Sequence, residues 1–123
     1  MAKVLIVDDD PDVVEACRLF LEKEGHEIGC AYNRTEGMEQ VAAFGPDLLV
    51  LDVMMEQPDD GIAMAQELRR TGFAKPILML TSVSKATGIE IGKDDAVVPV
   101  DAFHEKPISP QDLVASVKEL LSK

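Results

Sequence analysis

The sequence predicts an α/β domain built on a parallel β-sheet. Two apolar runs, 4–7 and 48–51, have the composition of strands that are covered on both faces. Each run ends in carboxylates, Asp8-Asp9-Asp10 after the first and Asp52 after the second. Strand-like runs also alternate along the chain with segments whose apolar residues recur at helical spacing. This alternation is typical of a parallel sheet with crossover helices.

The first predicted strand is Lys3–Val7, and a helix follows it at Asp10-Pro11. Aspartate is a favoured N-cap and proline is favoured at the first helical position, so the start of this helix is well marked. Gly25 is the expected stop. The apolar stripe of this helix is formed by Val13, Ala16, Cys17, Phe20 and Leu21.

The second strand is expected at Glu27–Ala31 and the third at 47–51. Between them, Asn33 and Glu36 form a capping pair that begins a helix, and Gly45-Pro46 ends it. The expected buried face of this helix consists of Met38, Val41 and Ala42.

The second half continues the alternation with a helix at 61–70 and a strand at 76–80. The segment 81–100 has no sustained apolar stripe and contains several glycines, so the fourth helix is expected to be short, broken or absent. A fifth strand is expected at Ala102–Glu105, and Ser109-Pro110 begins the last helix. The expected inner face of that helix consists of Leu113, Val117, Leu120 and Leu121.

These elements describe a doubly wound (βα)5 domain that covers residues 1–123. Because crossover connections are right-handed, the expected order of the five parallel strands is 2-1-3-4-5, as in flavodoxin-like folds. In such sheets the carboxyl ends of the strands line the ligand crevice.

Composition narrows the classes of function. The chain has 23 acidic and 12 basic residues and a formal net charge of −11, which argues against direct binding to nucleic acid. It contains no apolar stretch long enough for membrane insertion and no signal-peptide pattern at its start, so cytoplasmic residence is the default expectation.

Three carboxylates are predicted to share one cleft. Asp8 and Asp9 follow the first strand and Asp52 follows the third, so all three are expected at the same edge of the sheet. Like charges held this close repel one another unless a cation joins them. Ligands that are all oxygen favour a hard cation, and Mg²⁺ is the expected cofactor.

The chain resembles the receiver domain of two-component response regulators. The resemblance is carried by Val7-Asp8-Asp9, Leu51-Asp52, Thr81 and Lys106-Pro107, each of which follows or ends a predicted strand. It covers nearly the whole chain, and it implies a stand-alone phosphoacceptor that signals by binding another protein.

The resemblance also implies roles for these residues. Asp52 would accept a phosphoryl group from a phosphohistidine of a sensor histidine kinase or phosphotransfer protein. Asp8, Asp9, Asp52 and the carbonyl of Met54 would hold Mg²⁺. Lys106 and Thr81 would contact the phosphoryl oxygens, and the Lys106–Pro107 peptide bond would be cis.

A switch is implied by the same resemblance. Phosphorylation would draw Thr81 toward the phosphoryl group, and Phe103 would move inward to fill the vacated space. His104, next in the chain, is expected to face solvent. The downstream protein target stays unidentified, and the sequence leaves open whether phosphorylation drives dimerisation.

Two departures from the family pattern stand out. After Asp52, Glu56 stands where most receivers have proline, and Gly61 comes later than usual. In addition, Thr81 and Lys106 are farther apart than in typical members, across the segment where the fourth helix is uncertain.

Two other functions remain open from the sequence. Asp8 and Asp10 have the spacing of haloacid-dehalogenase-like phosphotransferases, which place a nucleophilic aspartate after the first strand and a second aspartate two residues on, although the chain is short for that class. A pseudo-receiver that binds partners without phosphorylation is the third alternative.

Overall fold

The computed structural model describes residues 2–53, 55, 60–81, 100–105 and 109–122; for Thr81 and Glu105 it describes only the backbone. The fourth helix, expected within 81–100, falls almost entirely outside these residues. The strands are β1 (Lys3–Val7), β2 (Glu27–Ala31), β3 (Leu48–Asp52), β4 (Ile77–Thr81) and β5 (Ala102–Glu105). The helices are α1 (Pro11–Lys23), α2 (Arg34–Phe44), α3 (Asp60–Arg70) and α5 (Pro110–Leu121).

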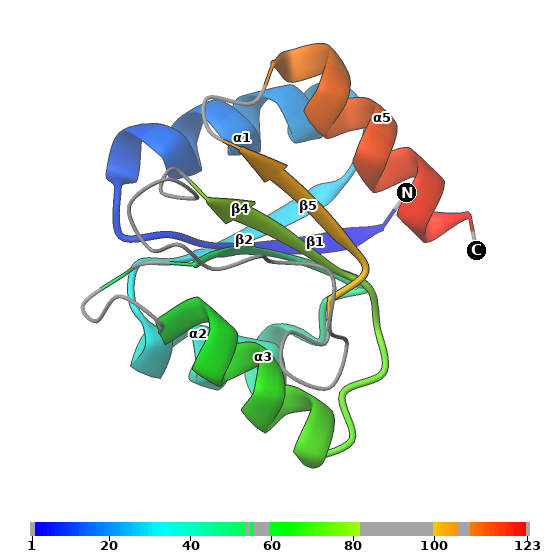
Figure 1. The fold of residues 1–123 in the computed structure, drawn as a ribbon. Helices are drawn as coiled ribbons and strands as arrows, with labels where there is room; N and C mark the ends of the chain where they lie inside the picture. The colour runs from blue at the N-terminus through cyan, green and yellow to red at the C-terminus, as the bar shows by residue number, and fades with distance from the viewer. Residues whose placement is uncertain (1, 54, 56–59, 82–99, 106–108, 123) are drawn as a thin grey trace.

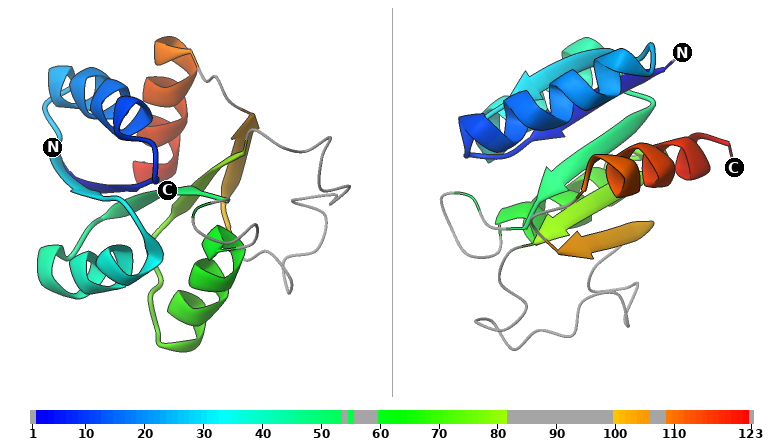
Figure 2. Two further views of the ribbon diagram at one scale, coloured as in Figure 1. Left: turned by 90° about the vertical axis from the view of Figure 1, so that its left-hand side faces the viewer. Right: turned by 90° about the horizontal axis from the view of Figure 1, so that it is seen from above.

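The five strands form one parallel sheet in the order β2-β1-β3-β4-β5, which confirms the predicted topology. Helices α1 and α5 cover one face of the sheet and α2 and α3 cover the other (Figure 1). The chain crosses from one sheet edge back to the centre after β2, so the ends of β1 and β3 lie side by side (Figure 2).

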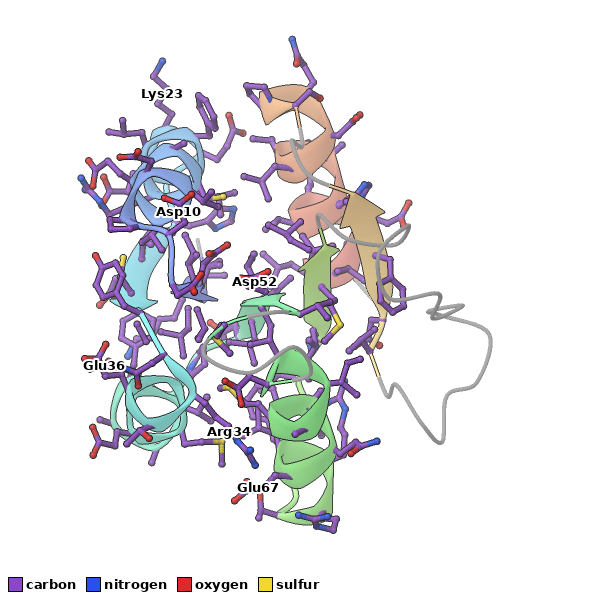
Figure 3. All side chains as sticks on the ribbon, turned by 60° about the vertical axis from the view of Figure 1, so that its left-hand side comes forward. Asp10, Lys23, Arg34, Glu36, Asp52 and Glu67 are labelled. Carbon is purple, nitrogen blue, oxygen red and sulfur yellow. The ribbon has the colours of Figure 1, made fainter. Side chains whose placement is uncertain are left out.

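Two apolar layers hold the helices to the sheet. The layer beneath α2 and α3 includes Leu49, Leu51 and Met64, and the layer beneath α1 and α5 includes Val50, Leu21 and Val117. All five residues of β3 are buried, as expected for a central strand covered on both faces. An ion pair between Arg34 and Glu67, 2.7 Å apart, also joins α2 to α3 (Figure 3).

The predicted helix caps are present. The Asp10 carboxylate accepts a hydrogen bond from the Asp12 amide at 2.9 Å, and proline follows it at the start of α1. Asn33 accepts from the Glu36 amide at 2.8 Å, while the Glu36 carboxylate accepts from the Tyr32 amide at 2.9 Å. These bonds satisfy amide groups that would otherwise lack partners at the helix starts.

Several predicted details were wrong. Strands β3 and β4 each lie one residue later than expected, because Asp52 still pairs with Leu80 in the ladder. Helix α3 begins at Asp60 instead of residue 61. In α2, Ala42 is exposed and Gly37 is the fully buried residue, because Gly37 lies against Val7 and Met64.

Candidate metal centre at the carboxyl end of the sheet

The pairing of β1 with β3 brings the three predicted carboxylates together. Val7 is in register with Leu51, so the residues that follow them, Asp8 and Asp52, occupy neighbouring positions at the sheet edge. Figure 3 shows this end of the molecule, with Asp52 at the end of β3 and Asp10 at the start of α1. The topology therefore creates the acidic cleft, since the two segments are far apart in the sequence.

The three side chains can reach a common ion. One carboxylate oxygen from each of Asp8, Asp9 and Asp52 lies within 4.8 Å of the other two. Two oxygens on opposite sides of a Mg²⁺ ion would be about 4 Å apart, because each Mg–O distance is about 2.1 Å. The donor set is thus of the right chemistry and nearly of the right size for Mg²⁺.

The cluster combines buried and accessible groups. Asp8 is 1 % exposed and Asp52 is 4 % exposed, whereas Asp9 faces solvent. Buried carboxylates need charge compensation, and the exposed Asp9 carboxylate leaves the cluster accessible to a cation from solvent.

Backbone hydrogen bonds hold the cluster in place. The Asp8 amide donates to the Ala31 carbonyl at 3.1 Å, which ties the end of β1 to the end of β2. The Asp8 carboxylate accepts from the Asp10 amide at 3.0 Å. On the other side, the Val53 amide donates to the Leu80 carbonyl at 3.0 Å and continues the β3–β4 ladder past Asp52. Asp8 and Asp52 are therefore placed by the ends of β1 and β3 and not by a loose loop.

Asp10 does not belong to the cluster. Its side chain caps α1, as predicted, and its carboxylate is exposed. In the haloacid-dehalogenase alternative Asp10 is the second aspartate of the motif, whereas here its carboxylate accepts the hydrogen bond that caps α1.

The other predicted site residues are placed only in part. The Thr81 backbone ends β4 beside Glu105, so Thr81 lies at the same sheet edge as Asp52. Phe103 of β5 is in register with Met79 of β4. Its side chain is half-buried and packs against the core beneath α2 and α3. Met54, Lys106 and Pro107 lie outside the described residues.

The structure gives a role in this region to Gly61, which the sequence singled out only for its shifted position after Asp52. Gly61 packs directly against the Asp52 backbone. Nothing in the sequence beyond a glycine near the start of a predicted helix marks such a contact.

Fold and site together define a doubly wound α/β domain with a cluster of three carboxylates at the switch point of the sheet. Residues 4–118 match the response regulator receiver domain family, and the chain belongs to that family. Phosphorylation on an aspartate is the general function of the family, so the chain is a signalling module of two-component systems.

Individual relatives support the assignment to the receiver domain family. The chain is 35 % identical over 125 residues to the alkaline phosphatase synthesis transcriptional regulatory protein PhoP of Bacillus subtilis (strain 168), covering 98 % of this chain and 49 % of PhoP. The chain thus spans about half the length of this relative. A two-component response regulator from Clostridium difficile is 27 % identical, with a TM-score of 0.85 and coverage of 100 % of this chain and 98 % of that one.

A CheY-like receiver domain protein from Methanospirillum hungatei JF-1 superimposes with a TM-score of 0.86, covering 99 % of this chain and 94 % of that one. Its sequence is 24 % identical, so this likeness concerns the fold alone. Among the described helices, none combines the length and apolar character that crossing a membrane requires.

Proposed function

We propose that Asp52 is the phosphoacceptor of this receiver domain and that Asp8, Asp9 and Asp52 hold the Mg²⁺ on which phosphorylation depends. One observation carries the proposal, namely that an oxygen of each carboxylate lies within 4.8 Å of the others at the ends of β1 and β3. Asp52 is the central member, since it ends the middle strand of the sheet.

The reaction is a transfer of a phosphoryl group between two side chains. A carboxylate oxygen of Asp52 attacks the phosphorus of a phosphohistidine, the new P–O bond forms, and the P–N bond breaks as the histidine nitrogen leaves. When bound, Mg²⁺ neutralises charge on the phosphoryl oxygens. Asp8 and Asp9 would hold the ion beside Asp52, and Lys106 and Thr81 would contact the phosphoryl oxygens.

The conformational change that signals phosphorylation takes place at the same edge of the sheet. Thr81 moves toward the phosphoryl group, and Phe103 shifts from its half-buried position toward the space that Thr81 leaves. As the family resemblance implies, the Met54 carbonyl would be a further Mg²⁺ ligand and the Lys106–Pro107 peptide bond would be cis. Hydrolysis of the aspartyl phosphate, assisted by the same groups, resets the domain.

Residues 1–123 act as one receiver domain in this proposal. Its donor is a sensor histidine kinase or a phosphotransfer protein in the cytoplasm, and its output is the binding of a downstream protein. The acidic surface, with a net charge of −11, supports a protein partner over nucleic acid.

Labelling by a small phosphodonor tests the assignment. Wild-type protein is incubated with phosphoramidate and Mg²⁺, and intact mass and peptide mapping locate the adduct. Asp52→Asn is expected to lose the adduct, and chelation of Mg²⁺ is expected to have the same effect.

Asp10→Asn is the matched control, because asparagine caps a helix as well as aspartate does and the acidic run is otherwise intact. It is expected to label like wild type. An adduct on Asp8 that persists in Asp52→Asn and disappears in Asp10→Asn would instead indicate a haloacid-dehalogenase-like enzyme. An absence of any adduct in wild type with Mg²⁺ would indicate a pseudo-receiver.

A further inference from the structure

Gly61 lies against the backbone that carries the proposed phosphoacceptor. A Cβ atom built on Gly61 would lie 1.9 Å from the Asp52 carbonyl oxygen and 2.8 Å from both the Asp52 carbonyl carbon and the Val53 Cα. Real Cβ atoms essentially never approach another heavy atom within 3.0 Å. Any side chain at residue 61 would therefore force the two backbones about 1 Å apart.

The glycine is required here by space and not by an unusual backbone angle. Among the described residues, the glycines with positive φ are Gly25, Gly45 and Gly72. Gly61 has a φ that alanine also adopts, so its lack of a side chain serves the close approach alone.

Neither the backbone of Gly61 nor that of Asp52 can move away from the contact without losing hydrogen bonds or core packing. The Gly61 amide donates to the Val53 carbonyl at 2.8 Å, and the next residues of α3 are anchored by Ile62 and Ala65 in the core. On the strand side, Asp52 pairs with Leu80 in the β3–β4 ladder. The clashing atoms all belong to the backbone, so no rotamer change relieves the contact. In Figure 3, α3 lies below the strand end that carries Asp52.

We propose that Gly61 is a positioning residue for the phosphoacceptor site. Its missing side chain lets the start of α3 sit against the end of β3, and this contact holds the Asp52 carboxylate beside those of Asp8 and Asp9. The inference rests on the proposed role of Asp52 and adds to it a constraint from α3.

The expected effect of a side chain at residue 61 is large. Removing a group that orients a metal ligand typically lowers metal affinity 10- to 100-fold, and a misplacement of about 1 Å at a reacting group costs about 100-fold in rate. Gly61→Ala is therefore expected to weaken Mg²⁺ binding at least about tenfold and to slow labelling by a similar factor or more.

The test compares the same substitution at the two ends of α3. Gly72 follows the helix, has φ +101°, and a Cβ there would meet no atom within 4 Å. Gly72→Ala therefore introduces backbone strain without a contact near the site. For wild type, Gly61→Ala, Gly72→Ala and Asp52→Asn, one measures the Mg²⁺ dissociation constant by calorimetry, the labelling rate with phosphoramidate, and the urea midpoint.

Weaker Mg²⁺ binding and slower labelling in Gly61→Ala, with both unchanged in an equally destabilised Gly72→Ala, would support the inference. Wild-type affinity and rate in a folded Gly61→Ala would overturn it, even if the variant is less stable, because the residue would then be structural only. The Asp52→Asn arm separates the two proposals, since persistence of the adduct there would refute the role of Asp52 itself.

Gly61→Ala could fold incompletely in buffer, so the calorimetry is repeated in trimethylamine N-oxide, which favours the folded state. A reduced Mg²⁺ affinity in the refolded variant would support the positioning role. Recovery of full affinity, or failure to fold even with the osmolyte, would assign Gly61 to folding alone and overturn the proposal.

Discussion

The His104 Nε2 and the Ser116 Oγ lie 2.6 Å apart and join β5 to α5. His104 is half-buried, so the expectation that it faces solvent was wrong. It follows Phe103 in the same strand, and the two side chains point to opposite faces of the sheet because strand residues alternate. The hydrogen bond therefore fixes the strand on the α5 side, while Phe103 packs on the α2–α3 side.

Loss of this hydrogen bond is expected to destabilise the domain. Ser116→Ala should lower the free energy of unfolding by about 1 kcal/mol, the usual net value of a partly buried hydrogen bond. Urea denaturation measures the change, and Ser122→Ala is the control, since its hydroxyl bonds to the Glu119 carbonyl at the exposed end of α5. A double-mutant cycle with His104→Phe that returns no coupling energy would contradict the assignment.

The acidic cluster is expected to reduce stability when Mg²⁺ is absent. Two unit charges about 4 Å apart in a water-like medium repel by about 1 kcal/mol, so Asp9→Asn should stabilise the chelated protein by roughly that amount. In excess Mg²⁺ the order should reverse, because wild type gains the binding free energy of the ion. The measurement is urea denaturation with chelator and with Mg²⁺.

Glu39→Gln is the control for that experiment, because it removes one exposed carboxylate of α2 outside the cluster. Glu39→Gln should leave the urea denaturation curves with chelator and with Mg²⁺ nearly unchanged. An Asp9→Asn variant that is stabilised by Mg²⁺ as strongly as wild type would show that Asp9 contributes little to the site.

Arg69 is expected to stabilise the domain by connecting the end of α3 to the segments that precede β4 and β5. Its guanidinium donates to the Phe73 and Lys75 carbonyls at 2.9 and 2.8 Å and to the Asp101 carboxylate at 2.9 Å. Asp101 in turn accepts from the Ile77 amide at 2.8 Å. Hydrogen bonds to charged groups contribute about 1.5–3 kcal/mol, so Arg69→Met should cost about 2 kcal/mol.

Hydrogen exchange measures locally how strongly the hydrogen bonds of Arg69 and Asp101 protect the start of β4. The Ile77 amide should exchange faster in Arg69→Met, because Asp101 loses the group that holds it. Arg70→Met is the control, since Arg70 is exposed and next in the helix. Equal losses of stability in the two variants would argue against a specific role for Arg69.

His26 is expected to make stability depend on pH. Its Nδ1 accepts a hydrogen bond from the Ala2 amide at 3.3 Å, which requires the neutral ring, and burial lowers the pKa of His26 below its usual 6.5. The folded state therefore favours the neutral form. This contribution is fully present above about pH 6.5 and is lost as the pH falls through the lower pKa of the folded state.

The measurement is the difference in unfolding free energy between wild type and His26→Gln across this range. Wild type should lose its advantage as the pH falls from 8 toward about 5.5, because only its ring becomes protonated. Parallel curves for the two proteins would indicate that other groups control the pH dependence.

Much of the local structure was predictable because its causes are local. The caps at Asp10 and Asn33 depend on side chains that bond to amides within three residues. The strand ends at Asp8 and Asp52 are marked by apolar runs that stop at carboxylates. Since parallel strands present their carboxyl ends at one edge, these two positions and the sheet order together predicted the acidic cluster.

Other features depend on contacts between segments distant in the chain. An apolar stripe predicted Ala42 on the inner face of α2, yet Gly37 is the residue that packs against Val7 of β1 and Met64 of α3. The His104–Ser116 bond likewise requires β5 and α5 to be docked before the two side chains meet.

The sequence by itself determined which residue types stand at the strand ends, because strand formation and helix capping follow from neighbouring residues. Tertiary structure alone decided how closely α3 approaches β3, and with it why residue 61 must be glycine. That approach is set by the packing of two backbone segments. The identity of a residue does not reveal which atoms the fold will place next to it.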